Sequence, residues 1–254
     1  MKINSDLGES FGLWQMGNDS HVMQVVDQAN IACGFHAGDP SVMMTTLQLA
    51  KEHQVAIGAH PSYPDIQGFG RRSMKMHANE IKNLVLYQVS ALHGMAKSLG
   101  LEVSYIKPHG ALYNDMMRDI EVFQGVLSAA TSFHEPLAIM IQSLPNNDER
   151  KQAAENAGVS LMFEVFADRR YTDAGLLTPR TQTGAVLTVD EVSQQTSMLV
   201  EKGAVLTENG QELSLEVDSI CVHGDDAESL EKARCVSKIV QAAKQPESIQ
   251  RGES

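Results

Sequence analysis

The sequence predicts an α/β protein built as a single parallel (β/α) barrel, with seven strands as the expected number. Short apolar runs alternate with longer amphipathic segments along nearly the whole chain, an order that produces parallel strands joined by helices. The length of 254 residues fits one such barrel, which typically needs about 250. Because no break at the midpoint divides this alternation, an open doubly wound sheet is the second choice.

Seven short apolar runs are the expected strands. They are Ile3–Leu7, Asn30–His36, Val55–His60, Ser104–His109, Leu137–Gln142, Leu161–Ala167 and Ser219–His223. Their length and apolar character are typical of strands buried in a parallel sheet.

Helical segments lie between these runs, and several have recognisable ends. The segment Asn79–Leu99 repeats apolar residues at helical spacing and is followed by Gly100, a common stop. Asp39 and Pro40 are typical of the N-cap and first turn of a helix that reaches His53. The other expected helices are Asp115–Ala130, Asn147–Ala157, Val189–Lys202 and Ala227–Ala243.

One barrel domain is expected over residues 1–243, followed by a polar C-terminal tail at 244–254. Asn209-Gly210 lies between two short apolar runs. This dipeptide favours a tight hairpin turn, so a small hairpin is expected near residues 204–217.

The composition argues against several classes of partner. The chain has 20 basic and 32 acidic residues, a net charge of −12, and such a field repels phosphate backbones and anionic lipid headgroups. No apolar run is long enough to span a membrane, and the N-terminus lacks the apolar core of a signal sequence. The 3 cysteines form no CxxC pair, so neither a disulfide framework nor a structural cysteine zinc site is expected. We expect a cytoplasmic protein that binds neither nucleic acid nor membranes.

Polar side chains recur at the C-terminal ends of the expected strands. Residues two or four apart share one face of a strand. Pairs two apart are Asn4 and Asp6, Lys107 and His109, and Cys221 and His223, and Glu164 and Asp168 are four apart. On two other strands, Ala32 and Gly34 lead to His36, and Ala56 and Gly58 lead to His60. Barrel enzymes build their active sites at this end, and their interiors are usually filled by bulky aliphatic residues. Small residues here leave room, so we expect an active site on which the polar side chains converge.

The residue types leave open whether this site holds a divalent metal. Asp6, His36 and His60 carry the oxygen and imidazole donors that such an ion prefers. No HxH, HExxH or CxxC spacing links them. If a metal binds, these three residues are its expected ligands.

Basic residues near the strand ends have two interpretations. Lys107 suits an oxyanion or a phosphate, or an internal ion pair with Glu164. Arg71-Arg72 and Arg169-Arg170 follow the third and sixth strands. They are either solvated loop charges or the natural anion clamps in a strongly acidic chain.

Two short motif matches carry little weight. Residues Gly8–Gly12 fit GxSxG, but no helix follows promptly, as a nucleophile elbow requires. Gly68–Ser73 ends in Ser where the dinucleotide fingerprint needs Gly, and the chain has no GxxxxGK[ST] P-loop. ATP phosphates, if bound, are therefore not held by a P-loop of this chain.

Seven blocks of the sequence resemble the LamB/YcsF family, in family order up to about residue 240. They are Ser5–Ser10, Ala29–Pro40, Gly58–Pro61 with the stretch to Asp65, Gly68–Arg72, Lys107–Asn114, Glu164–Arg169 and Cys221–Asp225. The chain departs from the family at Ser5, where Cys or Asn is usual, and at Ser62, where Gly is common. Ser5 faces away from Asp6, so neither change affects the expected pocket.

This resemblance implies the A subunit of a bacterial 5-oxoprolinase. Such a hydrolase opens 5-oxo-L-proline, a cyclic amide, to L-glutamate, with ATP as co-substrate, accompanied by Mg, and with partner subunits B and C. The family fold is similar to the barrel of carbohydrate deacetylases and some glycoside hydrolases, which agrees with the strand pattern.

For this chemistry we expect catalytic roles for Asp6, His36, His60, Lys107 and His109. Asp6 or His60 is the expected base for water, and Lys107 and His109 are the expected donors to an oxyanion or phosphate. One of Arg71, Arg72 and Arg169 is expected to hold the substrate carboxylate. The full expected substrate-binding set is Asn4, Glu9, Asn30, Asp65, Arg71, Arg72, Glu164, Asp168, Arg169 and His223.

Three other functions remain open from the sequence. A stand-alone metal-dependent deacetylase or amidohydrolase, acting on a small amide or amino sugar, would need no ATP and would lose activity on chelation. A non-catalytic scaffold would keep complex assembly and turnover when pocket residues are replaced. A carbohydrate-binding role agrees poorly with an aromatic content of 5%, since sugar sites usually stack rings on Trp or Tyr.

Overall fold

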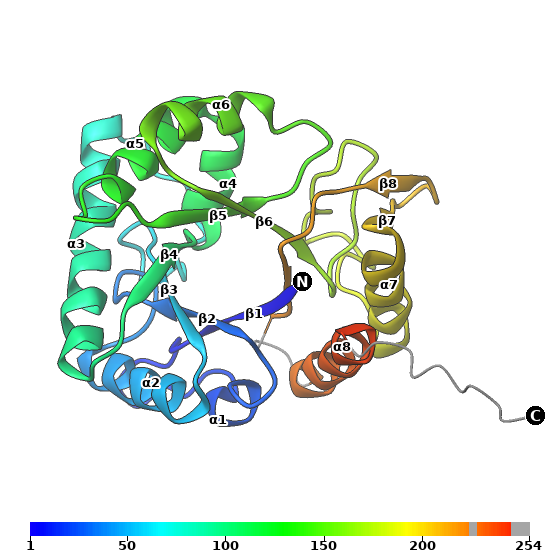
Figure 1. The fold of residues 1–254 in the computed structure, drawn as a ribbon, viewed down its shortest axis with the longest axis horizontal. Coiled ribbons are helices and arrows are strands. Elements are labelled where there is room, and N and C mark those ends of the chain that lie inside the picture. The colour runs from blue at the N-terminus through cyan, green and yellow to red at the C-terminus, as the bar shows by residue number, and fades with distance from the viewer. Residues whose placement is uncertain (224–227, 245–254) are drawn as a thin grey trace, which may run out of the picture.

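Seven parallel strands form a closed barrel surrounded by helices, which confirms the predicted fold class (Figure 1). The structure is a computed structural model and describes residues 1–223 and 228–244. Around the barrel the strand order is β1-β2-β3-β4-β5-β6-β9. The ring closes because β9 pairs with both β6 and β1.

The elements follow one another in a regular (β/α) order. The strands are β1 (Lys2–Leu7), β2 (Gln28–Ala32), β3 (Ala56–His60), β4 (Val103–Ile106), β5 (Ala138–Gln142), β6 (Leu161–Phe166), β7 (Ala204–Leu206), β8 (Glu212–Ser214) and β9 (Ser219–Cys221). The helices are α1 (Asp19–Val22), α2 (Pro40–His53), α3 (Ala78–Ser98), α4 (Gly110–Arg118), α5 (Ile120–Ala130), α6 (Asp148–Ala157), α7 (Val189–Lys202) and α8 (Ser229–Lys244).

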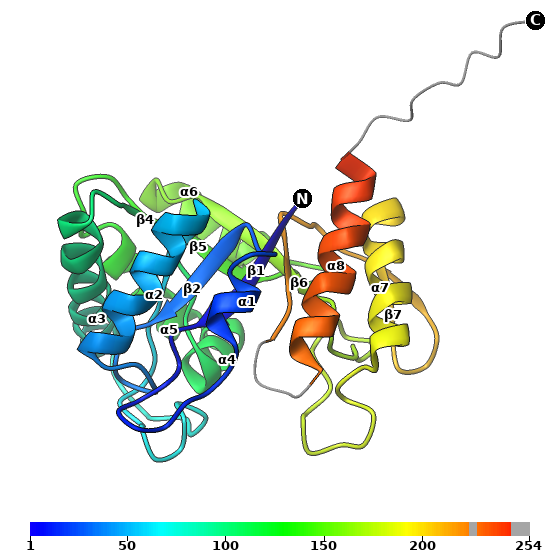
Figure 2. The same cartoon turned by 90° about the horizontal axis from the view of Figure 1, so that it is seen from below.

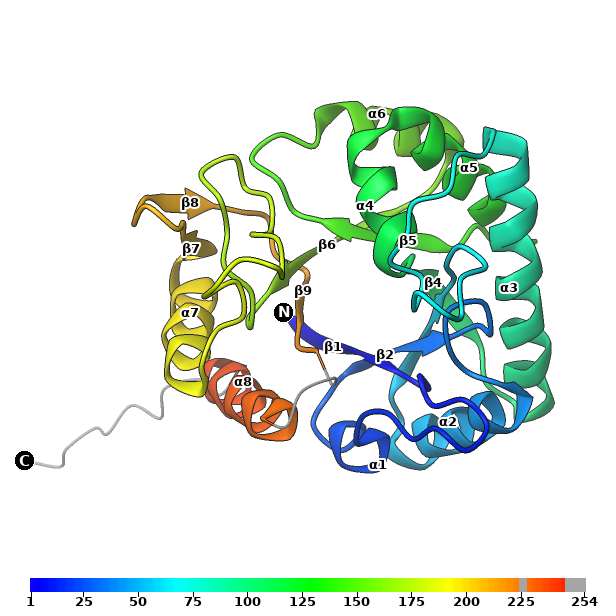
Figure 3. The same cartoon turned by 180° about the vertical axis from the view of Figure 1, so that it is seen from behind.

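The helices lie outside the ring of strands when the barrel is seen from either end (Figures 1 and 3). In the side view, α7 and α8 run next to each other beyond the last barrel strands (Figure 2). Outside the barrel, β7 and β8 form a separate antiparallel pair with Asn209-Gly210 between them. Among the described residues, no helix combines the length and apolar character needed to cross a membrane.

The two faces of β1 show how the sequence divides the barrel into an apolar outer layer and a polar interior. Ile3 and Leu7 are buried in the main hydrophobic cluster, and burial of each such side chain contributes about 1.5–3 kcal/mol. On the alternate face, Asn4 and Asp6 contact polar side chains of other strands. The aliphatic layer therefore stabilises the barrel, while its interior is available for charged groups.

Helix α2 has the predicted ends. The Asp39 side chain accepts hydrogen bonds from the backbone N–H groups of Ser41 and Val42 at 2.8 and 3.0 Å, and Pro40 occupies the first turn. These contacts satisfy backbone donors that have no partner within the helix. The helix ends at His53, before a left-handed residue.

Several expected elements had the wrong bounds. Strand β4 ends at Ile106 and β9 at Cys221, so Lys107, His109 and His223 follow their strands. Strand β2 ends at Ala32, so His36 lies in the following loop and not at the strand end. The expected helix Asp115–Ala130 was wrong, because two helices, α4 and α5, meet at Asp119. The backbone is extended at Asp119, and its carboxylate accepts a hydrogen bond from the N–H of Glu121. The expected start of the last helix at Ala227 and tail residues 245–254 lie outside the described residues.

Candidate active site

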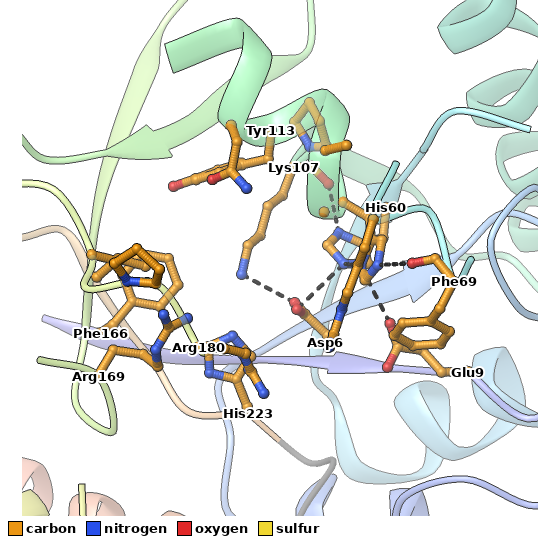
Figure 4. Close-up of a pocket in the computed structure, with 18 of the residues that line it drawn as sticks. Asp6, Glu9, His60, Phe69, Lys107, Tyr113, Phe166, Arg169, Arg180 and His223 are labelled. Carbon is orange, nitrogen blue, oxygen red and sulfur yellow. Dashed lines mark hydrogen bonds and ion pairs between the residues drawn. The ribbon is translucent and has the colours of Figure 1, made fainter. Parts of the chain in front are cut away.

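A cavity of about 460 Å³ opens where the barrel strands end (Figure 4). Its walls come from the ends of β1, β3, β4, β6 and β9 and from the segments that follow them. The residues that line it are Asp6, Glu9, His60, Phe69, Arg71, Lys107, Pro108, His109, Gly110, Ala111, Tyr113, Asn114, Arg118, Phe166, Arg169, Leu177, Pro179, Arg180, Thr181 and His223. Polar side chains from strands far apart in the sequence therefore converge at the barrel mouth.

Lys107 lies at the centre of a buried polar network on the floor of this cavity. Its Nζ is 3.0 Å from an Asp6 carboxylate oxygen and 3.0 Å from Glu164 Oε2. It also lies 3.2 Å from Asn4 Oδ1 and 3.2 Å from Cys221 Sγ. An ammonium has three protons to donate, so the barrel interior already satisfies this group.

Opposite charges fix the protonation states in this network. Burial alone would raise the pKa of Asp6, but His60 and Lys107 outweigh it and hold that pKa well below its usual value. Burial alone would lower the pKa of Lys107, but Asp6, Cys221 and Glu164 raise it well above its usual value. Asp6 is therefore an ionised and weakly basic carboxylate, and Lys107 is an ammonium.

The room expected beside Gly58 is filled by an aromatic ring. A Cβ on Gly58 would lie 2.1 Å from a ring atom of Tyr105 on the neighbouring strand, and the β3–β4 register shifts at this point. The Tyr105 hydroxyl donates to Asn30 Oδ1 at 2.6 Å, and Asn30 donates to an Asp6 oxygen at 2.8 Å. Gly58 thus admits a side chain that orients Asp6, and the open space lies higher, at the mouth.

Three histidines and a glutamate form a second cluster on one side of the cavity. His60 Nε2 and His109 Nδ1 are 2.9 Å apart. Glu9 Oε1 lies 3.2 Å from His36 Nε2 and 3.5 Å from His109 Nδ1. The rings of His36 and His109 stack with their centroids 3.8 Å apart. Burial first, and then the neighbouring imidazoles, lower the pKa of both stacked histidines well below the usual value.

These four residues could hold a metal ion, because one donor atom from each lies within 4.8 Å of every other. The group differs from the expected ligand set of Asp6, His36 and His60. Asp6 is directed instead to Lys107 and to His60, whose Nε2 lies 3.3 Å away.

Asp168 and His223 form a hydrogen-bonded pair at the opposite wall. His223 Nδ1 lies 3.0 and 2.9 Å from the two oxygens of Asp168, and the His223 backbone N–H donates to the same carboxylate. Burial would raise the pKa of Asp168, but His223 outweighs it and lowers that pKa to about 2. The Phe166 ring stacks on the His223 ring, so both tautomer and orientation are set.

Arginines give the cavity its positive charge. Arg71, Arg118, Arg169 and Arg180 all line it. Arg169 is buried and donates to the carbonyls of Thr178 and Ala185, so it anchors the segment that carries Arg180. Burial, followed by the positive charge of Arg180, lowers the pKa of Arg169. In the view of Figure 4, Arg169, Arg180 and His223 lie across the cavity from Glu9 and Phe69.

The structure places the residues expected from the sequence in three groups. Asp6, Glu9, His60, Arg71, Lys107, His109, Arg169 and His223 line the cavity, while Asn4, Asn30, His36, Glu164 and Asp168 contact the lining residues from behind. Asp65 and Arg72 pair with each other in the 61–73 segment and are not among the lining residues. The substrate roles of all of them stay predictions.

The sequence interpretation missed several lining residues. Tyr113, whose hydroxyl donates to Glu164 Oε1 at 2.6 Å, and Asn114 lie inside the recognised Lys107–Asn114 block but were assigned no role. Arg118 and Arg180 gave no local signal. Arg180 lies in an irregular segment after β6, and only the folded chain brings it to the mouth.

Comparisons with known proteins agree with the sequence blocks. The LamB/YcsF family model matches residues 1–251. A Vibrio campbellii protein, named as the A subunit of 5-oxoprolinase, is 54% identical over 231 residues, 91% of each chain. One of the same name from Vibrio parahaemolyticus is 52% identical over 232 residues, again 91% of each chain. The crystal structure of a lactam utilization protein from Thermus thermophilus superposes with a TM-score of 0.88 at 35% identity, covering 96% of this chain and 97% of that one. This chain therefore belongs to the LamB/YcsF family.

Proposed function

We propose that this chain is the A subunit of an ATP-dependent 5-oxoprolinase, which hydrolyses 5-oxo-L-proline to L-glutamate in the cytoplasm. The observation that carries the proposal is the match over 91% of the chain to relatives named as the A subunit of 5-oxoprolinase. That name supports partner subunits, which we take to be subunits B and C, and ATP with Mg as co-substrate.

The reaction needs ATP because a five-membered lactam is an unstrained amide whose closed form is favoured. Transfer of the terminal phosphoryl group to the lactam oxygen releases ADP and makes the lactam carbon electrophilic. Water then adds to that carbon and gives a proton to a base, and the carbon–nitrogen bond breaks as the ring nitrogen takes up a proton. The resulting acyl phosphate is hydrolysed by a second water to L-glutamate and phosphate.

His223 is the best-placed base for the attacking water. Its Nδ1–H is donated to Asp168, which leaves the Nε2 lone pair on the opposite edge of a ring that lines the cavity. Asp6, expected from the sequence as a base, has a pKa well below its usual value and is therefore a weak proton acceptor. We assign Asp6 to orienting Lys107 and His60.

The arginines suit the anionic groups of the reaction. We assign Arg71 and Arg180 to the carboxylate of 5-oxo-L-proline, since guanidinium groups bind carboxylates in a planar, two-pronged geometry. In a chain with a net charge of −12, this local excess of arginine also attracts the substrate to the mouth.

The test is release of glutamate and ADP from 5-oxoproline and ATP by this chain alone, by the partner subunits alone, and by all three together. We expect both products only from the complete mixture. No glutamate from any mixture would overturn the proposal.

One other function is a stand-alone metal-dependent amidohydrolase, which would need an ion bound by only part of the histidine cluster, with one position open for water. The same assay without ATP separates the two. Amide hydrolysis by this chain alone, without ATP and abolished by a chelator, would support the second function.

A further inference from the structure

The histidine cluster draws its four members from four successive (β/α) loops. Glu9 follows β1, His36 lies in the loop after β2, His60 ends β3, and His109 precedes the first residue of α4. All three histidines are buried. Any ligand held by all four side chains would therefore join four loops at the barrel mouth.

Hydrogen bonds at the outer edges of two rings determine which nitrogens face inward. His60 Nδ1 lies 2.6 Å from the Lys107 carbonyl oxygen, and His109 Nε2 lies 3.0 Å from the Phe69 carbonyl oxygen. A carbonyl only accepts, so both of these nitrogens carry protons. In neutral rings, His60 Nε2 and His109 Nδ1 then direct two lone pairs at each other across 2.9 Å. Such a contact requires a cation or an extra proton between the nitrogens.

Either a metal ion or a proton stabilised by the Asp6 carboxylate, 3.3 Å from His60 Nε2, satisfies this requirement. The outer hydrogen bonds of the rings and the spacing of the donor atoms favour the metal ion. Histidine ligands commonly donate their second N–H to a carbonyl, as His60 and His109 do here. Tetrahedral Zn²⁺ with bonds of about 2.0–2.1 Å places its donor atoms about 3.3–3.4 Å apart. Three of the separations, at 2.9, 3.2 and 3.5 Å, bracket this spacing, and all four donor atoms lie within 4.8 Å of one another.

We propose that Glu9, His36, His60 and His109 form a binding site for one divalent ion of the Zn²⁺ class. Three imidazoles and one carboxylate are donors that suit zinc. A closed set of four protein ligands is typical of a structural site, whereas catalytic sites keep an open position. The ion therefore fixes the four loops that shape the pocket. The proposal is independent of the substrate, because metal binding is measured directly.

The test uses the full chain, stripped with a chelator and then supplied with Zn²⁺ or Co²⁺. We expect one Zn²⁺ per chain after gel filtration, a higher melting temperature with the metal, and the intense visible absorption of tetrahedral Co²⁺. Glu9→Gln combined with His109→Gln should weaken Zn²⁺ binding more than tenfold, because replacing groups that only hydrogen-bond a metal ligand already costs about 10- to 100-fold. His134→Ala is the matched control, since this histidine is exposed in the segment before β5 and is not a member of the cluster, and it should bind like the wild type.

The wild-type measurements do not depend on how well the variants fold. Less than about a tenth of an equivalent of Zn²⁺ in the wild-type chain would overturn the proposal. The contact between His60 and His109 would then be explained by a shared proton. Wild-type affinity in the folded double variant would overturn it equally.

Discussion

Replacing Asp168 with Asn tests the pairing that orients His223. The substitution keeps the size of the side chain but removes its charge. The pKa of Asp168 is lowered from 3.8 to about 2 in the folded chain, and each pKa unit corresponds to about 1.4 kcal/mol. The ionised carboxylate thus contributes about 2.5 kcal/mol at pH 5, and we expect Asp168→Asn to lose about this much stability.

The pH dependence of this loss follows from the sign of the shift. Because the folded pKa is lowered, the contribution is complete above the unfolded pKa of about 4 and disappears as the pH falls through about 2. Urea unfolding of the wild type and Asp168→Asn should show this difference at pH 5. At pH 3 the difference should shrink to about half. A difference below about 0.5 kcal/mol at pH 5, or one that grows from pH 5 to pH 3, would contradict the pairing.

Three further predictions concern other parts of the barrel. Lys107→Met leaves two buried carboxylates without their cation, so urea unfolding at pH 7 should show a loss of about 3–5 kcal/mol; a loss below 1 kcal/mol would contradict the network. Gly58→Ala forces a Cβ against the Tyr105 ring and should cost about 1–3 kcal/mol in thermal unfolding, whereas an unchanged melting temperature would contradict the close approach. Arg180→Ala should raise KM for 5-oxoproline about 10- to 100-fold, since a hydrogen bond to a charged group is worth about 1.5–3 kcal/mol. Arg170→Ala is its control, because Arg170 pairs with Glu191 and does not line the main cavity, and its KM should match the wild type.

The fold and the position of the cavity were predictable from the sequence because both depend on periodic patterns. Alternating apolar runs predict parallel strands, and polar residues at the C-terminal ends of those runs mark the mouth of the barrel. For this reason Asn4 and Asp6 share the inner face of β1. Lys107 contacts both of them, and also Glu164 of β6, in the barrel interior.

The missing details depend on contacts between distant segments. The spacing of Gly58 predicts free space, but nothing local indicates that the Tyr105 ring fills it. The residue types nominate Asp6 as a metal ligand, whereas the three-dimensional position of Glu9 places a different carboxylate beside the histidines. Arg180 reaches the cavity only through an irregular segment anchored by Arg169.

We propose that the lactam is opened in the cavity at the mouth of this barrel. The most direct test is glutamate release from 5-oxoproline and ATP by complexes assembled with wild-type chain or with His223→Asn, after gel filtration has shown equal assembly. Loss of a general base lowers turnover by about 10²–10⁴-fold, and we expect a fall in this range. Turnover by an intact His223→Asn complex at the wild-type rate would contradict it.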